Sequence, residues 1–282
     1  MIRRLCVVGP GLLGGSVALA ARARGLAQEI VAVGRSDASV APALRAGAVD
    51  RGVTDLGEGL RGSDLCILAT PVATLENQLA AVWAAAEPDV VITDVGSTKG
   101  RIVERAERLA AGRPLAFVGS HPMAGSERAG FAEARADLFV GATVIVTPTA
   151  RTAPAALARV RGLWEAMGAR ITVLDPLTHD RAAAAVSHLP HLVADALVDA
   201  VTRMDPAFFE VAARGFRDTT RIAASSPPIW REIFQDNRAA LGEALAAFRK
   251  SLDHLENVLA TGDAVAVEAE LERIKKQRER VG

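Results

Sequence analysis

The stretch Leu5 to Gly14, LCVVGPGLLG, decides the fold of this chain. Its first four residues are an apolar run typical of a buried strand, and its glycines then follow the spacing G-x-G-x-x-G at the start of a helical pattern. In such a turn the first glycine allows a tight bend, the second lets backbone approach a pyrophosphate, and the third lets the helix pack on the strand. An ordinary glycine-rich turn is the alternative. We expect a dinucleotide cofactor bound by Gly9, Gly11, Leu12, Leu13 and Gly14.

Short apolar runs and helical patterns alternate downstream of this turn. We predict further strands near residues 30–33, 65–69, 90–93, 115–118, 144–146 and 171–173, with helices between most of them. This alternation predicts an α/β fold with a Rossmann-like, doubly wound parallel sheet. Thr70 and Pro71 close the run at 65–69, and we expect them beside the cofactor.

The pattern of apolar residues changes near Pro176. Beyond it there is no convincing strand pattern, whereas residues 192–204, 229–259 and 265–280 carry helical periodicity rich in Ala and Leu. We therefore predict a nucleotide-binding domain at 1–176 and an all-α C-terminal domain at 177–282. The apolar stripes of the long helices predict a homodimer formed through the helical domain, with a self-contained bundle as the alternative.

The overall charge excludes some classes of partner. The 33 Lys and Arg residues balance 33 Asp and Glu residues, which removes any general electrostatic argument for nucleic acid or an anionic membrane. A small-molecule substrate fits better. Cys6 and Cys66 lie in apolar runs, as buried free thiols do. The N-terminus imitates a secretory signal, but its glycines interrupt the apolar segment, so we expect a cytoplasmic protein.

Two polar segments follow predicted strands. Asp94 to Lys99 follows the run at 90–93, and Gly119 to Gly130 follows the run at 115–118. Because loops at the carboxyl ends of parallel strands carry chemistry in such folds, we expect the active site there. The second segment places His121 near hydroxyls, an acid and glycines. A histidine that only satisfies a backbone carbonyl is the alternative.

Motifs that resemble one known family occur along nearly the whole chain, at Gly9 to Ser16, Asp94 to Lys99, Gly119 to Gly130, Ser187 to His191 and Gly215 to Ala223. They resemble the prephenate and arogenate dehydrogenases of tyrosine biosynthesis. The resemblance implies a Rossmann-like domain followed by a helical dimerisation domain. It also implies oxidative decarboxylation of prephenate to 4-hydroxyphenylpyruvate, with hydride transfer to NAD(P)+.

The resemblance also implies roles for individual residues. His121 is placed on the substrate hydroxyl as base or hydrogen-bond acceptor, with Ser97 bonded to both groups. Arg221 is placed on a substrate carboxylate, whose two oxygens suit a planar guanidinium. The other residues implied in the substrate pocket are Ser126, Glu127, Asp180, His191, Arg217 and Trp230. A core tryptophan is the alternative for Trp230.

Asp180 and His191 are separated by eleven residues, which is close to three helical turns. A helix through both would point them to one side, and in the family the aspartate pairs with the arginine while the histidine faces the substrate. We expect His188 to have a structural role beside His191 rather than a catalytic one. We expect no metal, because these histidines and His179 have no recognisable ligand spacing.

The cofactor choice depends on the end of the second predicted strand. Gly34, Arg35 and Ser36 stand where NAD-binding folds place an acid for the ribose hydroxyls. A cation and a hydroxyl suit the 2′-phosphate of NADP, so we expect Arg35 and Ser36 to bind it, with NADP preferred over NAD. Asp37 keeps NAD open as the alternative.

Three alternatives concern the function. The enzyme could act on arogenate, or on both substrates as a cyclohexadienyl dehydrogenase; we favour prephenate because His191 offers a donor to a carbonyl. A 2-hydroxyacid-type dehydrogenase would need a lysine base, and the lysines of the helical half lie near its end without a suitable motif. In a non-catalytic dinucleotide-binding sensor, His121 and Arg221 would be structural.

Overall fold

A single sheet is the centre of the fold. The computed structural model describes residues 1–111, 116–126 and 128–280. Within these residues the sheet has the strand order β3 (Arg51–Val53), β2 (Ala27–Val33), β1 (Ile2–Val8), β4 (Leu65–Leu68), β5 (Val91–Asp94), β6 (Phe117–Pro122), β7 (Thr143–Thr147) and β8 (Arg170–Val173). The strand order reverses between β1 and β4, which is where doubly wound sheets bind ligands.

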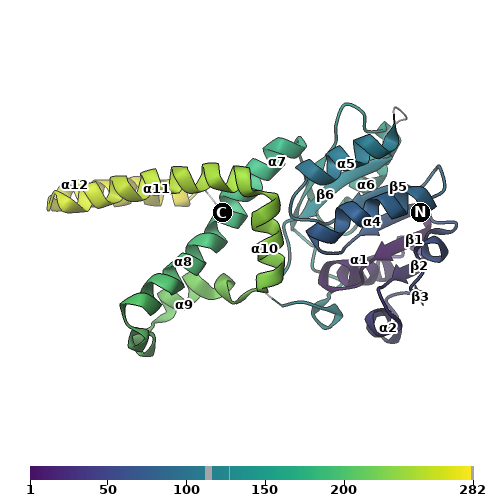
Figure 1. The fold of residues 1–282 in the computed structure, drawn as a ribbon, viewed down its shortest axis with the longest axis horizontal. Helices are drawn as coiled ribbons and strands as arrows, with labels where there is room; N and C mark the ends of the chain where they lie inside the picture. Colours follow the sequence, from purple (N-terminus) through teal and green to yellow (C-terminus); the bar gives the residue numbers. More distant parts are fainter. Residues whose placement is uncertain (112–115, 127, 281–282) are drawn as a thin grey trace.

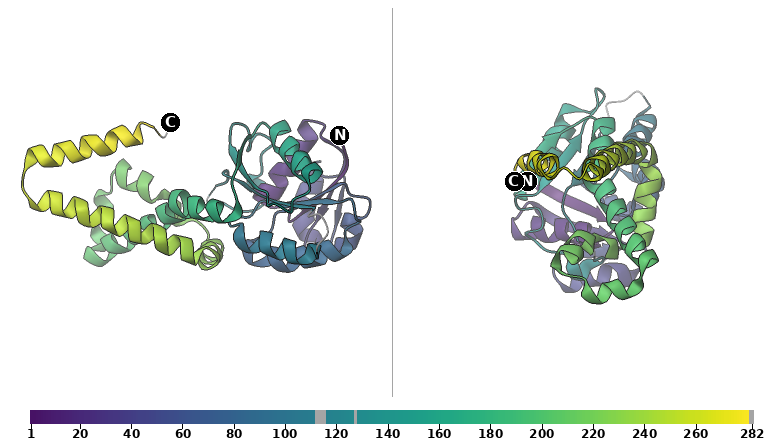
Figure 2. Two further views of the ribbon diagram at one scale, coloured as in Figure 1. Left: turned by 90° about the horizontal axis from the view of Figure 1, so that it is seen from above. Right: turned by 90° about the vertical axis from the view of Figure 1, so that its left-hand side faces the viewer.

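Helices cover both faces of this sheet, as Figures 1 and 2 show. They are α1 (Leu12–Ala23), α2 (Asp37–Arg45), α3 (Leu56–Leu60), α4 (Val72–Ala85), α5 (Gly100–Ala110) and α6 (Pro154–Ala166). Leu5 and Val7 of β1 pack in a cluster with α1, α2 and α6, whereas Cys6 and Val8 pack in a second cluster with α3, α4 and α5. Since successive strand residues point to opposite faces, the continuous apolar run at 5–8 serves both clusters.

Most of the predicted strands and helices are confirmed. The sequence did not predict β3, α3 or α5. One strand pair also differs, because β7 runs antiparallel to β6 while the other pairs are parallel. Between β6 and β7 the regular structure described is a single 3-10 turn, η1 (Phe131–Glu133). A parallel return normally uses a crossover helix, which this connection does not provide.

The strand β6 extends further than its sequence indicates. The expected strand ended at Val118, but β6 includes His121 and Pro122, and all of its residues are buried. Ser120 and His121 pair with Val146 and Ile145 of β7. His121 is therefore fixed by a strand ladder rather than by a loop; Leu115, at the start of the predicted run, lies outside the described residues.

The chain after Val173 is helical. Its elements are α7 (Pro176–Ala183), the π-helical turn η2 (Ala184–His188), α8 (Leu189–Met204), η3 (Pro206–Val211), α9 (Arg214–Thr220), η4 (Arg221–Ala224), α10 (Pro227–Asp236), α11 (Arg238–Ala260) and α12 (Ala264–Arg278). Pro176 starts α7, whose first amides are capped by the carboxylate of Asp175. Figure 1 shows α8 to α12 extending away from the sheet, with α11 and α12 farthest from it.

The helical pattern predicted at 229–259 is divided into two helices at Asn237. This residue is buried, and its amide nitrogen donates to the carbonyl oxygen of Asp180 and lies 3.1 Å from Nδ1 of His188. These bonds hold the corner between α10 and α11 against α7 and η2. Within the described residues, no helix is long and apolar enough to cross a membrane.

Candidate active site

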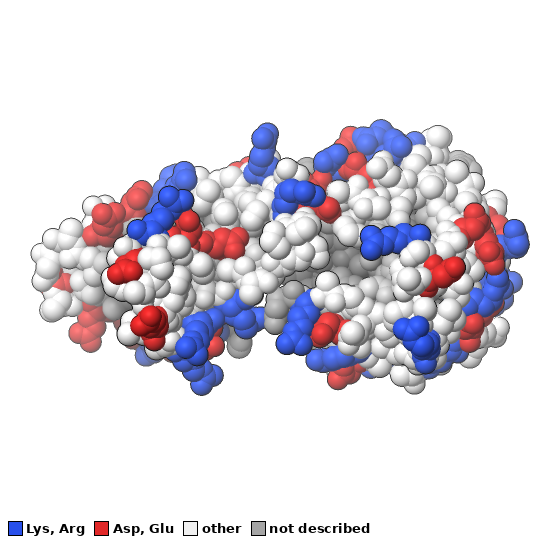
Figure 3. Space-filling model, turned by 60° about the horizontal axis from the view of Figure 1, so that its bottom comes forward, with Lys and Arg blue, Asp and Glu red and all other residues white. Residues whose placement is uncertain are grey.

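A pocket of about 700 Å³ lies between the sheet and the helical domain. Its walls come from the ends of β1, β4, β5 and β6 on one side and from η2, α8, η4 and α10 on the other. Figure 3 shows the surface hollowed between the two lobes, with Lys and Arg side chains near the hollow. The predicted site residues that line it are Gly11, Leu12, Leu13, Thr70, Pro71, Ser97, His121, Ser126, His191, Arg221 and Trp230.

The glycine-rich turn forms one end of this pocket. Gly9 has a φ of +89°, and a Cβ there would lie 2.7 Å from the Thr70 methyl carbon. A Cβ on Gly14 would lie 2.2 Å from the carbonyl oxygen of Gly9, so only glycine lets α1 approach the turn. Gly11, in contrast, meets no atom within 4 Å on its Cβ side. Gly11, Leu12 and Leu13 at the start of α1 line the pocket, and the first amides of a helix are the groups that bind a pyrophosphate, so the cradle fits a dinucleotide.

The turn after β2 lies beside this cradle. The amide of Gly9 donates to the carbonyl of Val33, which joins the ends of β1 and β2. A Cβ on Gly34 would lie 2.2 Å from the Ser39 hydroxyl oxygen, so close packing leaves no room for an acidic side chain there. Arg35 and Ser36 are exposed at this edge and lie outside the pocket lining described above.

The loop after β5 is held by a buried aspartate. Asp94 accepts hydrogen bonds from the amides of Gly96 and Ser120, and its carboxylate forms an ion pair with the ammonium of Lys99. Both side chains of the pair are completely buried. This arrangement fixes the loop that carries Ser97, which faces the pocket.

His121 lies at the floor of the pocket and is only 7% exposed. Its Nδ1 lies 2.9 Å from Nε2 of His179, a residue of α7 that is fully buried. Burial, followed by the nearby His179 and Lys99, holds the pKa of His121 well below its ordinary value of 6.5. The imidazole is therefore neutral near physiological pH and able to accept a proton.

Asp180 is the third member of this chain of contacts. Its Oδ1 accepts hydrogen bonds from Nδ1 of His179 at 2.8 Å and from the amide of Lys99 at 2.7 Å, and its Oδ2 accepts one from the amide of Gly100 at 2.8 Å. Burial alone would raise its pKa, but the bonds from His179 and from these two amides outweigh it, so the pKa lies below its ordinary value. Asp180 is therefore ionised and faces His179 and the start of α5.

His191 and Trp230 form the opposite wall. Their rings are stacked, with centroids 3.5 Å apart and an angle of 16° between the planes. Burial lowers the pKa of His191, and its Nδ1 is buried with no hydrogen-bond partner among the described residues. The π turn η2 between Asp180 and His191 changes their angular relation, and the two side chains contact different partners.

The remaining predicted residues have different positions. Ser126 is exposed at the pocket rim, and its hydroxyl bonds with the backbone of Arg128. Arg217 is exposed on α9 and, among the described residues, is not part of the lining. Glu127 lies outside the described residues.

Two residues were missed by the sequence reasoning. His179 was considered only as a metal ligand, and no local pattern connects it with a histidine 58 residues earlier. Glu232 lines the pocket from α10, and its carboxylate accepts a hydrogen bond of 3.2 Å from the amide of Ala73 at the start of α4. The sequence shows only that Glu232 lies in the first half of a helix that begins with two prolines. That pattern does not indicate that its carboxylate contacts the nucleotide-binding domain.

Comparisons with known proteins agree with this site. The family model described as the nucleotide-binding domain of prephenate dehydrogenase matches residues 17–173, and the model described as its dimerization domain matches residues 175–274. Prephenate dehydrogenase of Bacillus subtilis (strain 168) is 34% identical over 264 residues, which cover 92% of this chain and 71% of that protein. Cyclohexadienyl dehydrogenase of Zymomonas mobilis is 33% identical over 270 residues, which cover 93% of this chain and 90% of that protein.

The solved structures lead to the same result. The crystal structure of prephenate dehydrogenase from A. aeolicus, in complex with hydroxyphenyl propionate and NAD+, matches with a TM-score of 0.93 and 33% identity. The match covers 100% of this chain and 99% of that chain. The chain belongs to the prephenate dehydrogenase family.

Proposed function

We propose that this chain is a prephenate dehydrogenase, an oxidoreductase of tyrosine biosynthesis that converts prephenate to 4-hydroxyphenylpyruvate by oxidative decarboxylation. The observation that carries the proposal is one pocket that joins the glycine-rich cradle, His121 and Arg221. These parts meet three demands of the reaction: a place for the cofactor, an acceptor for the hydroxyl proton and a cation for a carboxylate. Bound NAD(P)+ supplies the hydride acceptor.

His121 acts on the ring hydroxyl. A hydride leaves the ring carbon that bears this hydroxyl, and the bond to the ring carboxylate breaks with its electrons entering the ring. Movement of the hydroxyl proton toward the neutral His121 raises electron density on the oxygen and so favours departure of the hydride. Ser97, which lines the same pocket, bonds the hydroxyl and orients it.

Arg221 binds a carboxylate of the substrate. It stands at the start of η4, on the side of the pocket formed by the helical domain. A guanidinium can bond both oxygens of a carboxylate, which fixes the ring in one orientation as well as adding affinity. Ser126 and Trp230 complete the wall around the substrate.

We favour prephenate over arogenate because of His191. Prephenate carries a keto group where arogenate carries an ammonium, and the imidazole of His191, which lines the pocket, offers a hydrogen-bond donor to a carbonyl. Glu232, an acid of the lining, is already bonded to the amide of Ala73. Activity on arogenate, or on both substrates, is the alternative, and steady-state kinetics with each substrate distinguishes them.

We also propose that NADP is preferred over NAD. The support is steric and electrostatic: Gly34 has no room for an acid, and the exposed Arg35 and Ser36 present a cation and a hydroxyl beside the cradle. These groups suit a 2′-phosphate. Asp37, at the start of α2, is the residue through which NAD could compete.

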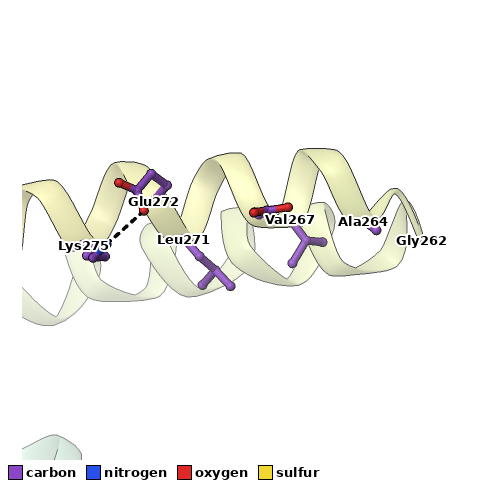
Figure 4. A pocket seen from close by; sticks show the side chains of 7 residues that line it. Gly262, Ala264, Val267, Leu271, Glu272 and Lys275 are labelled. Carbon is purple, nitrogen blue, oxygen red and sulfur yellow. Dashed lines mark hydrogen bonds and ion pairs between the residues drawn. The ribbon is translucent and has the colours of Figure 1, made fainter.

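We propose a homodimer formed through the helical domain, which begins after residue 176. The support comes from α12, where exposed apolar residues include Val265 and Leu271. Figure 4 shows Val267 and Leu271 pointing to the same side of α12, where they line a shallow pocket of about 570 Å³. Exposed apolar surface of this kind marks contacts between subunits. We also place the protein in the cytoplasm, where the buried thiols of Cys6 and Cys66 stay reduced.

A single-turnover experiment tests the proposed function. Prephenate is added to enzyme loaded with oxidised cofactor, and reduced nicotinamide is followed by its absorbance. The proposal expects one equivalent of reduced cofactor per site. Cofactor binding without reduction would instead support a non-catalytic dinucleotide-binding sensor.

A further inference from the structure

A chain of hydrogen bonds leads from the reacting end of the pocket to the start of α5. His121 Nδ1 contacts His179 Nε2 at 2.9 Å, and His179 Nδ1 contacts Asp180 Oδ1 at 2.8 Å. The side chain of His179 is 0% exposed and that of Asp180 is 16% exposed, so water competes little for these bonds. Three ring nitrogens take part in these bonds, namely Nδ1 of His121 and both nitrogens of His179, and each has one partner. Their proton positions can therefore be assigned one after another.

The proton positions follow from the acceptor at the end of the chain. The carboxylate of Asp180 can only accept, so Nδ1 of His179 carries a proton. Burial lowers the pKa of His179, so the ring is neutral and its Nε2 has a lone pair. That lone pair accepts from Nδ1 of His121, which must therefore carry the proton of the neutral His121 ring. Nε2 of His121 is left without a proton.

We propose that His179 and Asp180 are positioning residues that hold His121 in its Nδ1–H tautomer, so that Nε2 accepts the substrate's hydroxyl proton in the pocket. The inference deepens the proposed function, since it concerns the same histidine. It gives Asp180 a role in orienting the base rather than in pairing with Arg221.

The chain of contacts also crosses the domain junction. Asp180 belongs to α7, whereas the amides of Lys99 and Gly100 that fix its carboxylate belong to the nucleotide-binding domain. His121 belongs to β6 of the same domain. The orientation of the base thus depends on the helical domain being docked correctly.

The charged and titratable groups around His121 come from several elements. His179 faces it from α7, His188 from η2 and Lys99 from the end of the loop before α5. Asp180 of α7 and Asp94 at the end of β5 act on the neighbouring His179. Burial lowers the pKa of His188 to about 4, so this third ring is neutral as well. Asp94 is paired with Lys99. Asp180 is therefore the carboxylate that sets the proton positions in the hydrogen-bonded series His121, His179 and Asp180, called the relay below.

The tautomer can be measured directly in the wild-type protein. The chain has five histidines, so ring 15N spectra of histidine-labelled enzyme are simple enough to assign with single variants. We expect Nδ1 of His121 to be protonated and Nε2 to be unprotonated at neutral pH. An Nε2–H tautomer of His121 in the wild-type enzyme would overturn the proposal, whatever the variants do.

Two variants of His179 then separate positioning from structure. In His179→Gln the amide oxygen can still accept from His121, whereas His179→Phe fills the space without an acceptor. We expect His179→Phe to lose the Nδ1–H tautomer and to lower kcat about 100-fold or more, within the range that a positioned base contributes. His179→Gln should retain the tautomer and recover most of kcat. Equal loss in both variants, with His121 unchanged in its spectrum, would reject the positioning role.

Controls distinguish this proposal from the function itself. His254→Gln makes the same change on α11, far along the chain from the relay, and should leave both the His121 spectrum and kcat unchanged. If His121→Asn retained its turnover, the proposed role of the base would fail while the tautomer result stood. If turnover required His121 but its tautomer were Nε2–H, the positioning role of His179 and Asp180 would be rejected while the proposed function stood.

Discussion

Lys99 and Asp94 form an ion pair in which neither side chain has any solvent exposure. Removing one member leaves the other charge buried without its partner, which costs about 3–5 kcal/mol in proteins. We therefore predict that Lys99→Met lowers the free energy of unfolding by about 3–5 kcal/mol, measured by urea denaturation.

Two further variants test whether this loss belongs to the pair. Lys250→Met removes an exposed lysine from α11 and should change stability by no more than about 0.5 kcal/mol. Lys99→Met combined with Asp94→Asn should lose less than the sum of the single variants, because no buried charge is left. A Lys99→Met protein as stable as the wild type would mean that the pair contributes no net stability.

His121→Asn should lower kcat by about 100- to 10,000-fold, because it removes the proton acceptor. Cofactor affinity should be nearly unchanged. In the wild type the active form is the neutral imidazole, whose pKa lies well below 6.5. Activity should therefore be constant through neutral pH and fall only at a pH well below 6.5, where His121 becomes protonated. A pH profile of kcat/KM that already falls above pH 7 would contradict this assignment.

Arg221→Ala should act mainly on substrate binding. A charge-assisted bond to a carboxylate contributes about 1.5 to 3 kcal/mol, which corresponds to a rise in KM of roughly 10- to 150-fold. The measurement is steady-state kinetics with prephenate, and Arg203→Ala, an exposed arginine of α8, is the control. A fall in cofactor affinity with no change in KM for prephenate would assign Arg221 to another role.

Arg35→Ala tests the cofactor preference. We expect it to raise the KM for NADP and to leave the KM for NAD nearly unchanged, since only NADP carries the 2′-phosphate. Arg45→Ala, an exposed arginine at the end of α2, should affect neither cofactor. Equal losses with NAD and NADP, or a wild-type preference for NAD, would show that Arg35 does not bind the phosphate.

Leu271→Glu tests the dimer. The side chain is 58% exposed on α12, and a charge there should weaken an apolar subunit contact. Sedimentation at micromolar concentration should show a dimer for the wild type and a shift toward monomer for the variant. Gln277→Glu places the same charge elsewhere on α12 and should remain dimeric. A monomeric wild type would reject the proposed assembly.

The sequence by itself determined the local elements and the cofactor cradle. Gly9 and Gly14 are required by contacts within a few residues of the turn and with the residues just after β4, whereas Gly11 leaves open space on its Cβ side. Apolar periodicity encodes each strand or helix separately. For the same reason the helical character beyond Pro176 was predictable. The break at Asn237 was not, because its cause is a pair of bonds to Asp180 and His188, about 50 residues away.

Only the tertiary structure decided how the polar groups are paired. The antiparallel return of β7 places His121 inside a strand, and the docking of α7 brings His179 within 2.9 Å of it. Neither contact produces a repeating pattern in the sequence. A contact between two single side chains that are far apart in the sequence places no requirement on the residues next to them. The chain therefore specifies its elements through local repetition, whereas the pairing within its active site arises from the packing of those elements against each other.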